Sequence, residues 1–284
     1  MDFCIIIPVY NEEAYLERAL QSFVDQTVIP TKIIVVNDGS TDGTQKIINS
    51  FSEKHAFIEG TTSHSTNLHE PGSKVVNAFY TGYKLLDSRF DFIGKFDADI
   101  ILPPDYFEKV LALISSDEKI GIAGGNLYIQ KGNDWGFEAI SKKTKVRGPI
   151  KLYRWDCFKD IGGLKKSIGW DTVDELLAQY HGWKIKTDTS LHVKHLKPTG
   201  EAYSSAARFK QGEAFYKMRY GFWLTFIASG KLASQKRSFR FFLDSLRGYK
   251  KAKEENSDFI ISDEEGSFVR KLRWNNILRK IGLR

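Results

Sequence analysis

The first hundred residues alternate short apolar runs with segments of helical periodicity, and this alternation constrains the fold more than any other feature. Residues 3–7 form a continuous apolar run of strand length, and residues 32–36 and 91–96 are predicted as further strands. Apolar residues recur at helical spacing after Asn11, and again over about 73–86. Strands that alternate with helices predict an α/β domain with a mostly parallel sheet flanked by helices.

Polar residues follow the ends of the predicted strands at four β-to-α transitions. We expect Asn11 to cap the first helix and residues 37–43 to form the turn into the second. Pro103 and Pro104 predict the start of a further helix, because proline is tolerated in a first turn. Open α/β sheets bind ligands at the carboxyl ends of their strands, so this edge is where we expect the site.

Asp97 and Asp99 are the most distinctive polar residues at this edge. Residues two apart on an extended chain point to the same side, so both carboxylates are expected to face one ligand. Paired carboxylates suit Mg²⁺ or Mn²⁺, which bridge the phosphate oxygens of nucleotides. Taken alone, the pair is better explained as turn-forming and helix-capping aspartates, so the surrounding motifs have to decide.

Four segments together resemble the family 2 glycosyltransferases of the GT-A fold. They match in order and spacing at residues 5–12, 35–44, 72–77 and 96–99. The resemblance covers roughly residues 3–200. It implies a Rossmann-like GT-A domain, with a mostly parallel mixed sheet between helices.

The resemblance implies metal-dependent transfer of a sugar, with inversion at the anomeric carbon, from a nucleotide sugar to a saccharide or lipid-linked acceptor. The expected cofactor is Mn²⁺ or Mg²⁺, and the expected donor is a UDP-sugar, with GDP- and dTDP-sugars as alternatives. Such hexosyltransferase-type enzymes serve the synthesis of cell-surface polysaccharides and glycoconjugates. The alternative within the family is an inactive member that binds a nucleotide sugar without turnover.

The donor site can be assigned residue by residue from the resemblance. A tyrosine such as Tyr10 can stack on a base, Glu12 can accept from a sugar hydroxyl or base N–H, and Asp38 would bind the base edge. Lys74 would lie near the base or the diphosphate, with a solvated helix lysine as the alternative reading. The expected donor-binding residues are Pro8, Tyr10, Asn11, Glu12, Asp38, Lys74 and Asp97.

The expected metal ligands are Asp97, Asp99 and a histidine further along the chain. Related GT-A enzymes often provide such a histidine about twenty residues beyond an acidic helix. We favour His195 over His192 for this role, although a plain surface histidine explains either residue nearly as well.

The catalytic base is expected from the acidic segment 169–177, where the helix predicted over residues 172–181 begins. Counting back from Gly182 places Asp171 on the family's base aspartate, and Asp174 is the second choice. Trp170 stands where the family usually has a glutamate, which weakens this alignment. Capping of a helix N-terminus explains the same acidic residues without catalysis.

Residues 147–155 resemble the family segment that enters the acceptor side of the cleft. Gly148 would allow close approach of a sugar. Arg154 and Trp155 equally suit packing or surface positions.

A second domain is predicted from about residue 201, so that residues 1–200 form the GT-A domain and residues 201–284 a helical extension. The extension carries 18 Lys and Arg against 9 Asp and Glu, whereas residues 1–200 carry 24 against 26. Aromatic residues interleave with these basic residues, among them Trp223, Phe226, Phe241, Phe242 and Trp274. This composition suits a helix at an anionic membrane surface, while packing on the body or dimer formation are equal alternatives.

Other classes fit less well. No glycine-rich dinucleotide fingerprint follows the first strand, and the acidic loop there does not suit a pyrophosphorylase. A nucleic-acid binder would leave the acidic residues of the body without a purpose, so we expect no nucleic-acid partner. Two cysteines, no long apolar span and no basic leader indicate a cytoplasmic protein, peripheral to the membrane if the extension binds it. Oligomeric state is not predicted.

Overall fold

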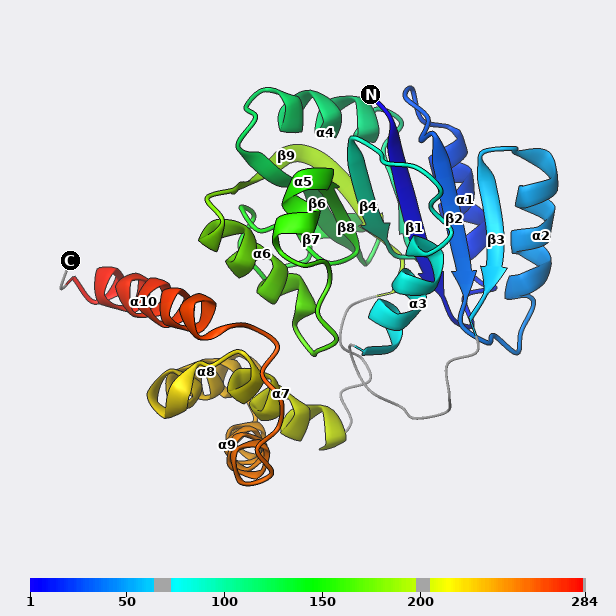
Figure 1. The fold of residues 1–284 in the computed structure, drawn as a ribbon. Coiled ribbons are helices and arrows are strands. Elements are labelled where there is room, and N and C mark those ends of the chain that lie inside the picture. Colours follow the sequence, from blue (N-terminus) through cyan, green and yellow to red (C-terminus); the bar gives the residue numbers. More distant parts are fainter. Residues whose placement is uncertain (64–72, 198–204, 283–284) are drawn as a thin grey trace. The chain divides into compact units, whose positions relative to one another are not determined.

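The computed structural model describes residues 1–63, 73–197 and 205–282 (Figure 1). The strands are β1 (Phe3–Val9), β2 (Lys32–Asn37), β3 (Ile58–Thr62), β4 (Phe92–Phe96), β5 (Ile100–Ile101), β6 (Ile120–Lys131), β7 (Asp134–Phe137), β8 (Ile150–Arg154) and β9 (Lys184–His195). The helices are α1 (Leu16–Val24), α2 (Thr44–Lys54), α3 (Ser73–Tyr83), α4 (Tyr106–Ser115), α5 (Trp155–Asp160), α6 (Trp170–Tyr180), α7 (Ser205–Lys217), α8 (Gly221–Gln235), α9 (Phe239–Glu254) and α10 (Asp263–Lys280).

Within the described residues, the strands form one mixed sheet in the order β3-β2-β1-β4-β8-β6-β9-β5, with β7 paired to β6. Strands β1 to β4 are mutually parallel, and β8 runs antiparallel to both β4 and β6. Since β8 is antiparallel to both of its neighbours, β6 runs in the same direction as β4. Strand β9 is parallel to β6 and therefore also runs in the direction of β1 to β4. The predicted α/β architecture, a mostly parallel sheet between helices, is therefore confirmed.

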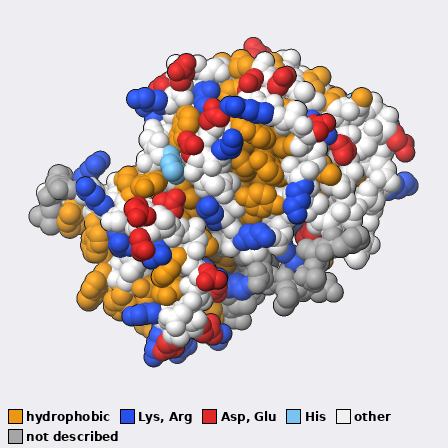
Figure 2. Space-filling model, viewed as in Figure 1, with side chains coloured by type: hydrophobic (Ala, Val, Ile, Leu, Met, Phe, Trp, Pro, Cys, Tyr) orange, Lys and Arg blue, Asp and Glu red, His pale blue; other side chains and the backbone are white. Residues whose placement is uncertain are grey.

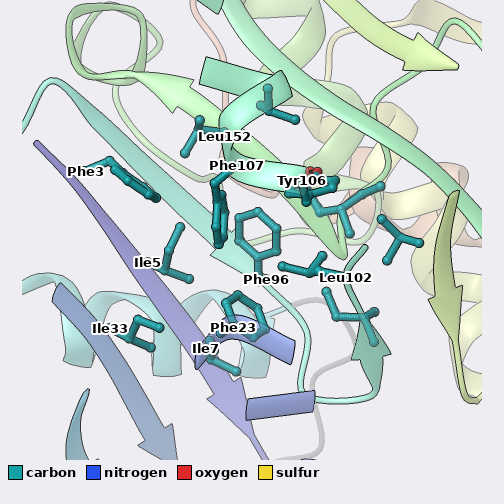
Figure 3. Close-up of a cluster of buried hydrophobic side chains, with 14 of the residues drawn as sticks. Phe3, Ile5, Ile7, Phe23, Ile33, Phe96, Leu102, Tyr106, Phe107 and Leu152 are labelled. Carbon is teal, nitrogen blue, oxygen red and sulfur yellow. Dashed lines mark hydrogen bonds between the residues drawn. The ribbon is translucent and has the colours of Figure 1, made fainter. Parts of the chain in front are cut away.

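The main core lies between the sheet and helices α1 and α4 (Figure 3). Alternate residues of β1, such as Ile5 and Ile7, point into it, together with Phe23 of α1 and Phe107 of α4. The ring of Phe96, at the end of β4, meets the ring of Phe107 edge-on at 5.6 Å between centroids. These buried apolar contacts hold the carboxyl end of β4 rigidly and so position the residues that follow it.

The opposite face of the sheet is covered by α3. A Cβ atom at Gly82 would lie 2.9 Å from side-chain atoms of Ile6 and Val36, so the helix backbone approaches the strands closely. Phe79 of α3 is fully buried. The beginning of α3, which carries Lys74, is thereby fixed to the sheet.

Strands β3 and β9 were not predicted from the sequence. Both carry mostly polar residues, and in β9 buried and exposed positions alternate only toward its end. Strands that depend on neighbouring strands rather than on apolar runs give little local signal.

The prediction that Asn11 caps the first helix is wrong. Helix α1 begins at Leu16 with Tyr15 as its N-cap residue. Asn11 has a φ angle of 52°, and its Oδ1 accepts a hydrogen bond from the backbone N–H of Thr41, over 2.8 Å. Its side chain is thus used to join two loops rather than to close a helix end.

The chain divides into two compact units. The sheet unit contains residues 1–63, 74–164 and 181–197 of the described chain, and the helical unit contains residues 73, 165–180 and 205–282. Helix α6 thus groups with α7 to α10. The boundary near residue 200 stays a prediction, whereas the helical character of the C-terminal extension is confirmed.

Close backbone packing between α7 and α9 organises the helical unit. A Cβ atom at Gly212 would lie 1.7 Å from the carbonyl oxygen of Ser245, and one at Gly248 would lie 2.0 Å from that of Phe209. Arg208 of α7 also donates to Asp244 of α9, over 2.8 Å. Glycine is therefore needed at this crossing for steric reasons.

Candidate active site

Asp97 and Asp99 lie in the turn that joins β4 to β5. The chain is not extended here, so the expected reason for their common orientation is wrong, although their carboxylates do come together. The backbone N–H of Asp97 donates to the carbonyl of Pro149 over 3.0 Å, which anchors the turn to the residue before β8. Asp99 is buried, whereas the Asp97 side chain is partly exposed.

His195 reaches the two aspartates through pairing of β5 with β9. His195, the last residue of β9, lies opposite Ile100, and the N–H of Leu196 donates to the carbonyl of Asp99 over 2.8 Å. One ligand atom from each of Asp97, Asp99 and His195 lies within 4.8 Å of the others. His192 is placed elsewhere, with its ring against that of Tyr128 at 4.0 Å between centroids.

Glu138 orients the His195 ring from behind. Its carboxylate lies 3.2 Å from His195 Nδ1 and 3.0 Å from a guanidinium nitrogen of Arg147, and all three side chains are buried. Because the carboxylate accepts the Nδ1 proton, Nε2 faces Asp99, 3.6 Å away. No sequence motif indicated Glu138, which is a single acidic residue after a short aromatic strand.

Three residues of the segment predicted to enter the acceptor side make contacts within the sheet unit. Arg147 is buried and bound to Glu138. Arg154 donates to the carbonyl groups of Ile114 and Ile120, over 2.7 and 3.1 Å. Trp155 stacks on Tyr83, so the packing alternative holds for Arg154 and Trp155.

Lys95 is a second residue that the sequence analysis missed. It lies on β4 with 2% of its surface exposed, and its ammonium pairs with the carboxylate of Asp97. A lysine inside an otherwise apolar strand is a signal that could have revealed it, because a buried ammonium needs a charged or polar partner.

The carboxylates of the site repel one another. Burial and, next, the charge of Asp97 raise the pKa of Asp99 to about 7, although His195 acts in the opposite direction. Burial disfavours the His195 imidazolium, but the hydrogen bond to Glu138 and the charge of Asp99 outweigh it and raise the pKa of His195. Two carboxylates and one imidazole form a donor set that fits a divalent cation, and such a cation would relieve the repulsion.

Glu12 also contributes to this negative region. Its Oε1 accepts from the Lys197 ammonium over 2.9 Å, while its buried Oε2 has no hydrogen-bond partner among the described residues. The charge of Glu12 helps to raise the pKa of Asp99, after burial and Asp97. The loop after β1 therefore borders the aspartate pair.

The loops that follow β1 and β2 form one platform beside the site. The backbone N–H of Asn11 donates to Ser40 Oγ, and that of Glu12 donates to Thr44 Oγ1, both over 2.9 Å. Asp38 is buried, and its Oδ1 accepts from Ser63 Oγ over 2.5 Å. This network fixes the polar residues at the carboxyl ends of the two strands.

Tyr10 is an exposed residue of this platform, and Lys74 of α3 lies beside it. Tyr10 is 48% exposed, and the Lys74 ammonium lies over its ring, 5.3 Å from the centroid. Pro8 lies within β1 and is partly buried. An exposed aromatic ring beside a cation suits a flat base and an anionic phosphate.

Asp171 and Asp174 both lie on α6, in the helical unit. Asp171 is in the first turn and partly buried. Asp174 is buried, and its Oδ1 accepts from the backbone N–H of Glu175 over 2.6 Å. Their role in catalysis stays a prediction.

Across the described ranges, none of the helices has both the length and the apolar character that a transmembrane segment requires.

Comparisons with known proteins agree with the sequence motifs. The family model "Glycosyl transferase family 2" matches residues 4–164. A probable glycosyltransferase, YdaM of Bacillus subtilis, is 30% identical over 203 residues, which cover 67% of this chain and 45% of that protein. An uncharacterized glycosyltransferase of Haemophilus influenzae is 28% identical over 49% of this chain and 41% of its own length. The aligned region thus spans about half or less of these two relatives.

Solved glycosyltransferases share the fold. TarS of S. aureus, in complex with UDP-GlcNAc, superposes with a TM-score of 0.56 at 22% identity, over 77% of this chain and 65% of that one. The mannosyltransferase PcManGT of Pyrobaculum calidifontis, in complex with GDP-Man and Mn²⁺, gives 0.59 at 14% identity, over 97% and 80%. With a family match over more than half of its length on a fold that solved glycosyltransferases share, this chain is a member of glycosyltransferase family 2.

Proposed function

We propose that the protein transfers a sugar from a nucleotide-sugar donor, with the help of a divalent cation, to a saccharide or lipid-linked acceptor. The observation that carries the proposal is the convergence of Asp97, Asp99 and His195 within 4.8 Å, at the strand edge that also presents Tyr10 and Asp38. Two solved proteins of the same fold, whose complexes contain UDP-GlcNAc and GDP-Man with Mn²⁺, support it.

Asp97, Asp99 and His195 would hold the cation. Imidazole is a better ligand for Mn²⁺ than for Mg²⁺, so the inclusion of His195 favours Mn²⁺. When bound, the cation acts as a Lewis acid that stabilises the departing nucleoside diphosphate. Lys95 pairs with the Asp97 carboxylate, and Glu138 orients the His195 ring, so both would position ligands of the cation.

The loops after β1 and β2 would bind the nucleotide of the donor, with UDP favoured and GDP or dTDP as alternatives. Tyr10 offers its exposed face to the base, and Asp38 accepts from the base edge. Lys74, beside Tyr10, places a positive charge where it can meet the diphosphate. Pro8, Asn11 and Glu12 shape this loop, and Glu12 has an oxygen left to accept from the ribose or base.

Inversion requires a base that removes the proton of the acceptor hydroxyl as its oxygen attacks the anomeric carbon. We assign this role to Asp171 of α6, with Asp174 as the second candidate. The proton passes to the carboxylate, while the nucleoside diphosphate leaves with the bonding electrons. We place the reaction on the cytoplasmic side of the membrane, in the synthesis of surface polysaccharide or glycoconjugate.

Thermal unfolding with nucleoside diphosphates tests the metal and donor together. We expect UDP or GDP to raise the melting temperature more with Mn²⁺ than without it, because at a given concentration a ligand that binds more tightly stabilises the fold more. Asp99→Asn should remove the part of the shift that depends on Mn²⁺. The matched control is Asp134→Asn, at an exposed position at the start of β7.

The same wild-type protein is then incubated with UDP-, GDP- and dTDP-sugars and Mn²⁺, and donor hydrolysis is followed. Slow hydrolysis of one donor supports an active transferase. Donor binding without hydrolysis or transfer would identify an inactive family member instead. If Mn²⁺ changes neither binding nor hydrolysis of any donor, the metal assignment is wrong.

A further inference from the structure

Helix α8 buries one side within the helical unit and leaves an apolar side exposed. Leu224, Thr225 and Ser229 are buried within the helical unit. On the other side, Trp223 is 68% exposed, and Phe222, Phe226 and Ile227 are also exposed. A helix of this kind has an apolar surface left over after its own unit has folded, and such surfaces mark contacts with another partner.

The exposed apolar surface continues onto α9. Phe239 is 73% exposed, and Leu243 is exposed as well. The ring centroids of Phe222 and Phe226, Phe226 and Phe242, and Phe242 and Phe239 are 6.2, 5.1 and 6.0 Å apart, so the rings form a continuous row. We define the aromatic face as Phe222, Trp223, Phe226, Ile227, Phe239, Phe242 and Leu243. Hydrophobic side chains gather over this part of the helical unit in Figure 2.

A groove between α8 and α9 opens within this face. Its volume is about 480 Å³, and the rings of Phe226, Phe239 and Phe242 line it. Gly230 contributes to the opening, because it places no side chain between the two helices. The face is therefore uneven and apolar, and can receive flexible hydrocarbon.

The two helices that carry the aromatic face are also basic, and Arg237 lines the groove itself. Residues 221–248 contain five basic residues, all of them exposed: Lys231, Lys236, Arg237, Arg240 and Arg247. The one acidic residue of this segment, Asp244, is buried and bound to Arg208, and it also pairs with Arg247 over 3.5 Å and Arg240 over 3.9 Å. The segment keeps an excess of positive charge. An interface between protein copies is usually depleted in lysine, whereas exposed aromatic rings ringed by Lys and Arg fit an anionic lipid surface.

We propose that the aromatic face docks the protein onto an anionic phospholipid bilayer, with α8 and the start of α9 in the headgroup layer. Of the aromatic residues singled out in the sequence, Trp223, Phe226 and Phe242 belong to this face. Phe241 is buried and does not, and Trp274 lies on α10. Such docking would bring the proposed site to lipid-linked acceptors, but its test does not depend on glycosyl transfer.

The test measures co-sedimentation of the full-length protein with vesicles, in the absence of donor and metal. We expect binding to vesicles that contain phosphatidylglycerol, weaker binding to pure phosphatidylcholine, and loss of binding at high salt. The double variant Trp223→Ser/Phe226→Ser should reduce the affinity by roughly tenfold or more, since these side chains supply much of the buried apolar area. Arg237→Glu/Arg240→Glu should reduce binding to the anionic vesicles selectively.

Trp274→Ser is the matched control, because Trp274 is a partly exposed tryptophan of the same unit outside the aromatic face. Circular dichroism shows whether each variant is folded, and light scattering reports its oligomeric state. Absence of wild-type binding, or an equal loss in Trp274→Ser, overturns the proposal. So does a wild-type dimer that the Trp223→Ser/Phe226→Ser variant dissociates, because the face would then join two copies of the chain.

Two variants distinguish a failure of the docking proposal from a failure of the proposed function. Asp99→Asn protein should still bind the vesicles, and Trp223→Ser/Phe226→Ser protein should still hydrolyse a water-soluble donor at the wild-type rate. Loss of vesicle binding in Asp99→Asn would contradict the docking proposal, since that residue lies in the sheet unit.

Discussion

The carboxylate of Glu138 lies 3.2 Å from Nδ1 of His195, although the two residues are 57 positions apart in the sequence. Both side chains are buried, and the contact leaves Nε2 of the histidine directed at Asp99. A carboxylate behind a ligating histidine fixes the ring and its tautomer and makes it a stronger ligand. Glu138 is therefore a positioning residue for the proposed cation site.

Replacing Glu138 with glutamine should weaken Mn²⁺ binding by about 10- to 100-fold, the range found when partners of metal ligands are removed. Titration calorimetry with Mn²⁺ measures this effect. Binding of UDP without metal should change little, and Glu118→Gln, at an exposed position, is the control. Equal Mn²⁺ affinities in wild-type and Glu138→Gln protein would show that the contact serves only packing.

Asp171→Asn should lower turnover of the donor by roughly 10²- to 10⁴-fold, because the acceptor proton would lose its base. The donor KM should change far less. Comparison with Asp174→Asn decides between the two residues, and a melting curve is needed because Asp174 is buried. Unchanged turnover in Asp171→Asn would transfer the role to Asp174.

Cys4 should resist thiol reagents in the folded protein. Burial raises its pKa from 9.0 to about 12, so only about one thiol in 10⁴ is ionised at pH 8. Cys157 is also buried. Native protein at pH 8 should react slowly with Ellman's reagent, whereas the denatured chain should release two equivalents. Rapid reaction of one equivalent in the native state would contradict this picture.

The same shift predicts a fall in stability at alkaline pH. Above about pH 9 the unfolded chain releases the Cys4 proton, whereas the folded chain keeps it until about pH 12. The contribution of this thiol to the free energy of unfolding is therefore full below pH 9 and declines by about 1.4 kcal/mol per pH unit above it. Urea unfolding of wild-type and Cys4→Ala protein between pH 8 and 10 measures how the free energy of unfolding changes with pH. The decline that is due to Cys4 should be absent in the variant.

Gly212→Ala should destabilise the helical unit. The added methyl group would overlap the carbonyl of Ser245, so α7 and α9 would have to separate, at a cost of about 1–3 kcal/mol. Gly230→Ala is the matched control, because the nearest atom to its Cβ would lie 3.9 Å away and alanine gains up to about 1 kcal/mol in a helix. Urea unfolding followed by circular dichroism should separate the two variants. Equal stability would mean that the helices do not cross at Gly212.

Local patterns in the sequence were sufficient for the elements that carry their own apolar runs. Strands β1, β2 and β4 and the helices after them follow from spacing within short windows, and the motif residues at their ends follow from the order of these elements. Predictions that depended on local geometry alone were less secure. Asn11 caps no helix, because its side chain is bound to Thr41 in another loop.

The sequence by itself therefore determined the α/β architecture, the family, and the strand edge at which Asp97 and Asp99 lie. The sequence left His195 and His192 as alternatives with a preference for His195, and the tertiary structure brought His195 to the aspartates through the pairing of β5 with β9. It also revealed Glu138 and Lys95 as buried partners of His195 and Asp97. The physical reason is that apolar periodicity is written in neighbouring residues, whereas a buried charge finds its partner only after distant strands have come into register.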